Sequence, residues 1–567
     1  MRKAAIVVFA ALAGAPLPAL AQLAQSEPTN AGTGLLAPDA LTTELPNGFQ
    51  RNSSSKLQAL IPGDLSKFVD RKPEQAAAES FYQARNYHPI WTGSPDALKR
   101  AEGAIAFLRN VKSEGLEPRD YLTPDLSADL SEEQAAKAEL QLTGSILRYA
   151  RHASSGRVSY TRVSASILYP DHAADPAEVL NKVASAQDMN AVLQSFEPQQ
   201  PGFVALKAAL AKELAAPQDD ATLENREASK KHRGKDANER SRKNAADTII
   251  ANMERWRWLP RDLGQAHVVV NVPDFTLGVY KDGAPVWHTR IVVGKPGNLA
   301  TPLLSETMKY LTINPTWNVP PSIIRNEYLP ALERDPGALE RIGLRVSNNP
   351  DGSLRVYQPP GERNALGRIR FNFPNQFLVY QHDTPNKNLF ARDSRAFSHG
   401  CMRVENPEKY AEVLLSLSQP AEGYSIARIR SLYGDQERTI NLKQPIPVHV
   451  TYQTAFVDKQ GQLNFRHDVY GLDTATLKLM RNDERMIADT PIARPQNASS
   501  KPVMARAPAP AREDREFQGQ YREDRESQGQ VQSGGWFAFG TAERSYASSP
   551  YRSRSSSRGF DRADGLW

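Results

Sequence analysis

Cysteine is nearly absent from this sequence: Cys401 is the one cysteine in 567 residues. A single thiol has no partner within the chain, so a disulfide-stapled scaffold is excluded. The sequence gives little support to a metal centre, because His382, His399 and Cys401 are joined by no second cysteine and no close pair of carboxylates. The thiol is either an inert buried side chain or a reactive one, and composition leaves both interpretations open.

Long apolar runs are also missing beyond the N-terminus, so no stable membrane span is predicted there. The N-terminus begins with the basic residues Arg2 and Lys3, continues with an apolar run, and reaches a small-residue site at Ala19-Leu20-Ala21. This pattern predicts a cleavable signal peptide over residues 1–21 and export of the chain. An uncleaved anchor is the alternative, and the complete cleavage signal argues against it.

Charge of one sign is not in strong excess, and both ends of the chain are polar. A net charge of +6 is too small to indicate nucleic-acid binding. Residues 22–65, rich in Ser, Thr, Asn, Pro and Gly, are predicted to be a disordered leader. Residues 486–567, which contain the repeat REDREFQGQY and REDRESQGQV, are predicted to be a disordered Arg-, Ser- and Pro-rich tail.

The folded centre begins with a helical pattern. Within residues 66–215, apolar side chains such as Ala104, Phe107 and Leu108 recur at helical spacing and predict a helical domain. Residues 216–245 have almost no large apolar side chain and dense mixed charge. They are predicted to be a solvated linker or an exposed charged helix.

After residue 246 the apolar period changes to two, which indicates strands. The segment FTLGVYKDGAPVWHTRIVVG predicts a hairpin that turns at Asp282-Gly283. TMKYLTINP and QFLVYQH predict two further strands, and residues 318–370 between them predict a helix-containing insertion that is a candidate lid. The chain is therefore expected to have an α+β fold.

The surroundings of Cys401 suit a nucleophile. His382 ends a predicted strand and supplies a candidate base. Cys401 precedes a helix predicted to start at Asn406 and Pro407, and Gly400 permits a tight turn whose backbone N–H groups suit an oxyanion. Arg403 adds positive charge that suits a substrate carboxylate.

The pattern His382 followed by Ser398-His399-Gly400-Cys401-Met402-Arg403 resembles the signature of the L,D-transpeptidases with a YkuD-type catalytic domain. The segments VNVPDFTLGVYKDG, VVGKPGNLATP, INPTWNVPPSI and NALG are similar to the YcbB-like branch of that family. FYQARNYHPIW and GLEPRDY are similar to the scaffold domain of that branch. The resemblance implies a mostly-β catalytic domain over residues 246–475, capped by residues 318–370 and preceded by the helical scaffold domain.

The resemblance also implies roles for individual residues. Cys401 is the nucleophile, His382 the general acid and base, His399 an orienting residue, and the Gly400 backbone part of an oxyanion hole. Arg403 and Ser398 are expected to contact substrate. Trp317 and Tyr380 are expected to line the cleft, although aromatic residues at strand ends are more often part of a core.

The implied substrate is peptidoglycan. A donor tetrapeptide stem acylates the cysteine and loses D-alanine, and the diaminopimelate amine of a second stem resolves the thioester to give a 3→3 crosslink. The resemblance implies no cofactor, sensitivity to carbapenem-type inhibitors, and a periplasmic location at the cell wall. Two alternatives stay open: an L,D-carboxypeptidase that resolves the same acyl-enzyme with water, and a non-enzymatic wall-binding scaffold protein.

Overall fold

The structure is a computed structural model of the chain. It describes residues 53–126, 130–215, 232–320, 323–348, 350 and 354–481. The predicted signal peptide, the predicted tail and residues 216–231 of the predicted linker lie outside the described residues. No helix in the described part of the chain is both long and apolar enough to cross a membrane.

The N-terminal half is helical, as predicted. Its helices are α1 (Ser54–Asp64), α2 (Lys72–Ala84), α3 (Pro95–Arg109), α4 (Glu132–Ser155), α5 (Tyr160–Val163), α6 (Pro176–Ala184), α7 (Met189–Gln194) and α8 (Pro201–Ala215), with 3-10 turns η1 (Leu65–Lys67), η2 (Val111–Glu114) and η3 (Pro118–Asp120). Helix α4 starts at a capping box, in which Ser131 and Gln134 exchange side-chain-to-backbone hydrogen bonds. Its middle turns are buried among α1, α3 and α6.

The prediction of a disordered leader over residues 22–65 is wrong at the C-terminal end of that range. Residues 54–64 form helix α1, and Leu57 and Ile61 lie on its buried side. Leu65 continues this apolar row into the core shared with α4. A Ser- and Pro-containing segment read as a leader therefore contributes apolar side chains at helical spacing to the core.

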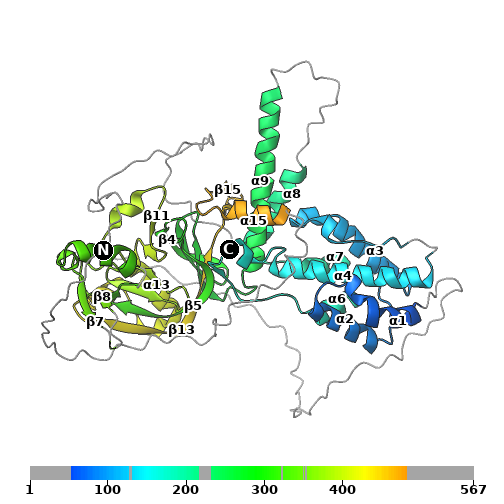
Figure 1. Ribbon diagram of the computed structural model, residues 1–567, viewed down its shortest axis with the longest axis horizontal. Helices are drawn as coiled ribbons and strands as arrows, with labels where there is room; N and C mark the ends of the chain where they lie inside the picture. The colour runs from blue at the N-terminus through cyan, green and yellow to red at the C-terminus, as the bar shows by residue number, and fades with distance from the viewer. Residues whose placement is uncertain are drawn as a thin grey trace, which may run out of the picture. The chain divides into compact units, whose positions relative to one another are not determined.

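The C-terminal half is built on one sheet, with neighbouring strands in the order β1-β5-β13-β2-β3-β4-β12-β10-β9. Strand β9 also pairs with β5, so the sheet closes on itself. Figure 1 shows its long strands β5 and β13 side by side, and helix α13 (Pro407–Ser418) packs against β13. The strands are β1 (Ile167–Leu168), β2 (Ala266–Asn271), β3 (Thr276–Lys281), β4 (Ala284–Gly294), β5 (Leu303–Ile313), β9 (Ile369–Asn372), β10 (Gln381–His382), β11 (Ala396–Ser398), β12 (Met402–Val404) and β13 (Arg438–Thr451).

Two local predictions have different outcomes. The β3–β4 hairpin is confirmed, and Asp282 and Gly283 both take the positive φ values, 51° and 75°, that its turn needs. The strand predicted over QFLVYQH is wrong in its first part, since only Gln381 and His382 are in β10. The Asn375 side chain bonds the N–H groups of Phe377 and Val379, which replaces strand pairing with a tight turn.

The boundary between the two halves differs from the one predicted at residues 215 and 246. Strand β1, inside the predicted helical domain, pairs in parallel with β5. The Tyr169 hydroxyl donates to the carbonyl of Val450 in the sheet at 2.8 Å. Helix α9 (His232–Trp258) starts within the predicted linker, which is the helical alternative that the charge pattern left open. Apolar residues of α8 and α9 belong to the same core as the sheet.

The insertion over residues 318–370 is a small subdomain with its own three-stranded sheet, ordered β6-β8-β7. Its elements are β6 (Trp317–Asn318), the π-helix η4 (Ile324–Tyr328), α11 (Leu329–Arg334), α12 (Ala338–Arg341), β7 (Arg345–Asn348) and β8 (Leu354–Gln358). Val319, Leu339 and Val356 form the centre of a separate hydrophobic cluster. The Asn364 amide donates to the carbonyls of Pro315 and Pro359, so it ties the two ends of the insertion together.

Beyond β13 the chain returns to the sheet and to α9. The remaining elements are the 3-10 turns η5 (Lys387–Ala391) and η6 (Pro420–Glu422), helix α14 (Ile426–Arg430), strands β14 (Ala455–Val457) and β15 (Leu463–Phe465), and helix α15 (Leu472–Arg481). Helix α13 begins at Pro407 after Asn406, as predicted. The Asn406 amide donates to Thr289 at 3.3 Å and makes no side-chain cap, so it joins the helix start to β4.

Candidate active site

His382 lies on β10 between two strands. It is directly opposite Arg403 of β12, in a parallel pair, and directly opposite Arg370 of β9, in an antiparallel pair. Residues opposite one another on paired strands project their side chains to the same face of a sheet. The fold therefore sets an arginine on either side of His382 in one row.

His382 is buried, and its ring orientation is fixed from one side. Nδ1 lies 2.5 Å from the carbonyl oxygen of Asp383. A carbonyl only accepts hydrogen bonds, so Nδ1 carries the proton and Nε2 is left as the basic nitrogen. Burial, with Arg403 as the next cause, lowers the pKa of His382 to about 3. The imidazole is therefore neutral at pH 7.

Asp383 holds this carbonyl in place. Its carboxylate accepts from the backbone N–H groups of Arg368 and Thr384, at 2.8 and 2.6 Å, and from the Lys387 ammonium at 2.6 Å. Asp383 is itself buried. Because the carboxylate is anchored on several sides, the backbone that orients His382 is rigid.

Cys401 is half-buried and lies just before β12. Burial raises the pKa of its thiol to about 11, while hydrogen bonds from the Tyr380 backbone and hydroxyl and the charges of Arg370 and Arg403 oppose that rise. At rest the site therefore holds a thiol and a neutral imidazole, each of which is a neighbour of Tyr380. A thiol and a base in these states react by moving the proton to the base during attack, rather than from a preformed thiolate.

Tyr380 connects the other parts of the site. Its ring meets the His382 ring edge-on at 5.7 Å between centroids, and the Arg370 guanidinium lies over it at 5.5 Å. Its hydroxyl is hydrogen-bonded to Trp317 and to Cys401. The Trp317 indole can only donate, so the Tyr380 hydroxyl accepts from it and keeps its own proton for the sulfur, an arrangement that favours the thiolate of Cys401. The structure thus places Tyr380 at the thiol and Trp317 beside Tyr380. That the two aromatic residues line a substrate cleft stays a prediction.

Ser398 and Gly400 shape the turn that carries Cys401. Gly400 has a φ of 113°, which favours glycine. Its N–H donates to the Ser398 hydroxyl at 3.2 Å, and that hydroxyl donates to the Cys401 carbonyl at 2.5 Å. Ser398 is buried, and its hydroxyl braces the turn, so substrate contact by Ser398 stays a prediction. The exposed His399 lies on the same turn, and its orienting role also stays a prediction.

Thr301 fastens this turn to the end of β4. Its hydroxyl donates to the Gly400 carbonyl at 2.8 Å and accepts from the Gly294 N–H at 2.9 Å. The Tyr470 hydroxyl donates to the Gly294 carbonyl at 2.7 Å and accepts from the Thr301 N–H at 3.1 Å. A side chain at position 294 would meet the Leu299 carbonyl oxygen, so glycine is required there.

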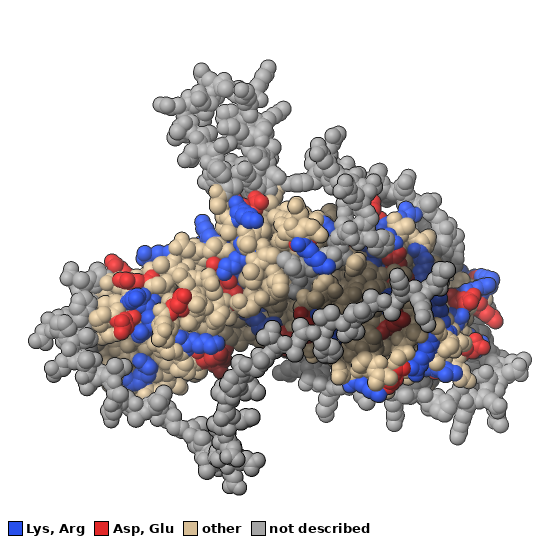
Figure 2. All heavy atoms as spheres, turned by 180° about the vertical axis from the view of Figure 1, so that it is seen from behind, with Lys and Arg blue, Asp and Glu red and all other residues tan. Residues whose placement is uncertain are grey.

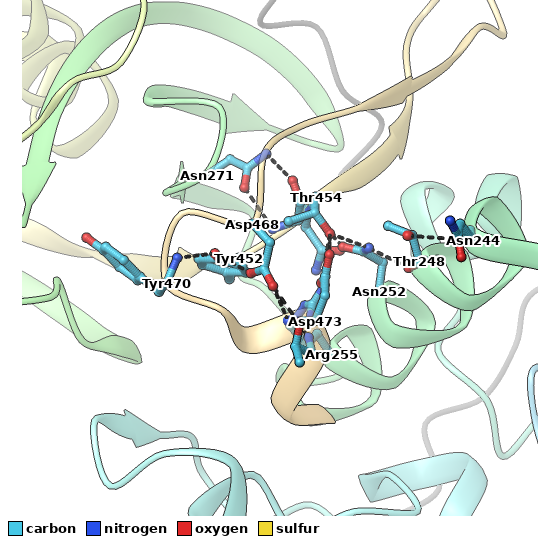
Figure 3. A network of polar contacts seen from close by, with 12 residues as sticks. Asn244, Thr248, Asn252, Arg255, Asn271, Tyr452, Thr454, Asp468, Tyr470 and Asp473 are labelled. Carbon is cyan, nitrogen blue, oxygen red and sulfur yellow. Dashed lines mark hydrogen bonds and ion pairs between the residues drawn. The ribbon is translucent and has the colours of Figure 1, made fainter. Parts of the chain in front are cut away.

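A polar network continues from Tyr470 to helix α9 (Figure 3). The Tyr470 N–H donates to the Tyr452 hydroxyl at 2.7 Å, and that hydroxyl donates to Asp468 at 2.7 Å. Beside them, Asp473 at the start of α15 accepts from Thr454 and pairs with Arg255 of α9. The turn that carries Cys401 is thereby connected to helices α9 and α15, which lie outside the sheet.

Three residues around the site were not singled out from the sequence. Thr301 stands in the quoted segment VVGKPGNLATP, so its motif was visible although its role was not. Arg370 reaches the site only through the register of β9 against β10. Tyr470 reaches it through a contact with a residue far away in the chain. Within the described residues, no group of three or more His, Cys, Asp or Glu side chains is placed to hold a metal ion.

Known families match both halves of the chain. Residues 265–434 match the family model of the L,D-transpeptidase catalytic domain, YkuD, and residues 76–210 match that of the Scaffold domain. His382 and Cys401 lie inside the first match. The sheet-bearing half of the chain thus contains a region similar to the L,D-transpeptidase catalytic domain of the YkuD type, and the helical region before it contains one similar to the Scaffold domain.

Individual relatives are more distant. A Haemophilus influenzae protein, assigned provisionally by its name to the L,D-transpeptidases, is 29% identical over 247 residues, which are 41% of this chain and 49% of the relative. This chain therefore spans about half the length of that relative. An L,D-transpeptidase from Mycobacterium smegmatis is 15% identical over 33% of this chain and 58% of its own, with a TM-score of 0.18. L,D-transpeptidase 3 from Mycobacterium tuberculosis, solved with a faropenem-derived adduct, is 15% identical over 33% and 60%, with a TM-score of 0.17.

Proposed function

We propose that the chain is a peptidoglycan L,D-transpeptidase that forms 3→3 crosslinks through an acyl-enzyme on Cys401. The thiol–imidazole pair carries this proposal: a half-buried thiol lies in the site of an oriented neutral His382, within a domain that matches the catalytic domain of the family. The intact pair also argues against a non-enzymatic wall-binding scaffold protein.

In the first half-reaction the Cys401 sulfur attacks the carbonyl carbon of the third residue of a donor tetrapeptide, and its proton passes to His382 Nε2. The carbon–nitrogen bond to the terminal D-alanine then breaks, and His382 returns the proton to the leaving amine. In the second half-reaction a diaminopimelate amine gives a proton to His382 and attacks the thioester. The carbon–sulfur bond breaks, and the sulfur takes the proton back as the thiol.

The oxyanion of each tetrahedral intermediate needs donors near the sulfur. The Gly400 N–H is engaged by Ser398 in the resting structure, so its use requires that this 3.2 Å bond be exchanged. The Tyr380 hydroxyl already points to the sulfur and is a second donor. We therefore assign the oxyanion contact to the Gly400–Cys401 backbone together with Tyr380.

The branch and location of the enzyme are part of the same proposal. A scaffold domain before the catalytic domain and a separate insertion subdomain support the YcbB-like branch. Periplasmic action at the cell wall rests on the signal peptide predicted over residues 1–21. Carbapenem-type β-lactams are expected to acylate Cys401, since their strained amide presents a carbonyl to the same nucleophile.

Analysis of muropeptides tests this proposal. Sacculi rich in tetrapeptide stems, incubated with the purified chain, should gain 3→3 dimers, and the Cys401→Ala variant should produce none. Tripeptide stems without dimers would indicate the L,D-carboxypeptidase alternative. If the wild-type chain leaves the stems unchanged, both the L,D-transpeptidase and the L,D-carboxypeptidase hypotheses are contradicted.

A further inference from the structure

Arg370 and Arg403 lie on either side of His382 and both act on the Cys401 thiol. Each is directly opposite His382 in the strand register, and the charge of each opposes the raised thiol pKa. Two cations therefore converge beside the base and the nucleophile. Strand pairing rather than a flexible loop holds their backbones in this position.

Neither arginine has an ion-pair partner among the described residues, and the Nε atom of each is buried without a hydrogen bond there. Both side chains are half-buried, so their charges are only partly hydrated. A partly buried cation without an ion-pair partner favours binding of an anion, because the anion replaces the hydration that burial removes.

Arg395 and Arg290, by contrast, have hydrogen-bond or ion-pair partners within the fold. Arg395 donates Nε, Nη1 and Nη2 to the carbonyls of Ile291, Arg392 and Phe275, at 3.1, 2.8 and 3.1 Å. Arg290 makes a paired contact with the Glu405 carboxylate. Arg395 and Arg290 thus have carbonyl or carboxylate partners, whereas Arg370 has the Tyr380 ring as its neighbour and neither Arg370 nor Arg403 has an ion-pair partner among the described residues.

We propose that Arg370 and Arg403 together bind the terminal carboxylate of the leaving residue of the donor stem, and so select a stem that ends one residue after the cleaved bond. This inference rests on the proposed function. Arg403 was expected to contact a substrate carboxylate, and the inference adds Arg370 and names the carboxylate.

The position follows from the chemistry of the leaving group. His382 must reach the leaving nitrogen to protonate it. The carboxylate carbon of a terminal amino acid lies two bonds from that nitrogen, at a distance of about 2.5 Å. A terminal carboxylate is therefore held beside His382, where the two arginines are. A stem one residue longer carries its carboxylate roughly 3.5 Å further away and presents a neutral peptide group instead.

On the face shown in Figure 2, Lys and Arg side chains are interspersed with Asp and Glu where the described residues are visible. That face therefore carries charges of both signs, and the pair of arginines at His382 acts on a carboxylate as a local charge.

Alkylation of the single cysteine tests the charge pair without any peptide substrate. Iodoacetate and iodoacetamide both alkylate a thiol, and they differ in that only iodoacetate carries a carboxylate. The ratio of their rate constants at Cys401 should be higher than for free cysteine. It should fall roughly 3- to 10-fold in Arg370→Gln and in Arg403→Gln, and less in the matching lysine variants.

Arg368→Gln is the matched control, since Arg368 is next to β9 and pairs with Glu362 at 3.6 Å. It should leave the ratio unchanged, and melting temperatures show that each variant is folded. An unchanged ratio in both glutamine variants would overturn the inference. So would an equal loss of rate with both reagents, which would mean that the arginines only favour the thiolate.

Peptide donors test the selection itself. A tetrapeptide stem and its C-terminal amide differ only in the carboxylate, and KM for the amide should be roughly 10- to 100-fold higher with the wild-type chain. In Arg370→Gln the two KM values should approach one another. Equal KM values with the wild type would overturn the inference. Absence of any turnover on the tetrapeptide would instead contradict the proposed function, while the alkylation ratio would still decide the role of the arginines.

Discussion

Glu139 and His382 are both buried ionisable groups, and the two halves of the chain treat them differently. In the scaffold core, the Glu139 carboxylate accepts from the backbone N–H groups of Ile90, Trp91 and Thr92, and from the Tyr82 hydroxyl. In the catalytic half, His382 is held through Nδ1 alone, and its neighbours Arg370 and Arg403 keep unpaired atoms.

The comparison separates structural from functional burial. The Glu139 carboxylate joins helix α4 to the segment of Ile90, Trp91 and Thr92. Because it accepts several hydrogen bonds, its oxygen atoms are occupied by structural partners. His382 has one side-chain hydrogen bond, through Nδ1, so Nε2 is left for the proton transfer that the proposed reaction requires. Loss of the first kind of group should lower stability, and loss of the second should lower activity.

The largest expected effect is on catalysis by His382→Ala. Without the base, the rate of Cys401 acylation should fall roughly 10²- to 10⁴-fold. The melting temperature should change little, because the buried His382 contributes through a single side-chain hydrogen bond. Stopped-flow acylation by a carbapenem measures the rate. Acylation of this variant at the wild-type rate would place the base elsewhere.

Glu139→Ala should lower the stability of the fold and leave the reactivity of Cys401 unchanged. It leaves three backbone N–H groups buried without partners, and we expect a loss of about 3–5 kcal/mol in the free energy of unfolding. Denaturant titration measures this loss, and alkylation of Cys401 in the folded fraction should stay at the wild-type rate. A variant as stable as the wild type would show that the carboxylate is not the structural centre of the scaffold.

A smaller effect is expected from a pair of buried histidines, His267 and His449. Burial lowers the pKa of His449 to about 4, with the adjacent His267 acting in the same direction and Asp262 opposing it. The unfolded chain therefore takes up a proton first as the pH falls below about 6.5. The stabilisation present above that pH should be lost toward pH 4, by about 1–2 kcal/mol at pH 5. The His449→Gln variant should show a flatter dependence in urea titrations between pH 7.5 and 4.5, and an identical slope would contradict this account.

The smallest expected effect tests how the nucleophile turn is anchored. Tyr470→Phe keeps the stacked ring but removes the hydroxyl that joins Gly294 to Thr301, and acylation should slow roughly 3- to 10-fold. Tyr169→Phe is the control, since it removes a buried hydroxyl bonded to the Val450 carbonyl, away from the turn. Equal rates in both variants would mean that the network only stabilises the fold.

The sequence predicted those parts of the molecule that local patterns encode. The β3–β4 hairpin, the start of α13 and the helical N-terminal half follow from turn residues, Pro407 and apolar spacing. His382 and Cys401 were likewise visible as a motif, and the structure places Tyr380 next to both of them. Their roles stay predictions.

What the sequence did not predict depends on contacts between distant segments. Arg370 faces His382 only because β9 pairs with β10 in one particular register. Strand β1 joins the catalytic sheet from inside a helical region, and its two residues carry no strand signal of their own. The turn before Tyr380 follows from side-chain bonds of Asn375, which compete with the strand that an apolar run favours.

The central claim is that Cys401 and His382 form an acyl-transfer pair, and the mass of the intact chain after exposure to a carbapenem tests it most directly. The wild-type chain should gain one adduct, located by peptide mapping on Cys401, and the Cys401→Ala variant should gain none. A wild-type chain that stays unmodified, or a Cys401→Ala variant that gains the same adduct, would contradict the account.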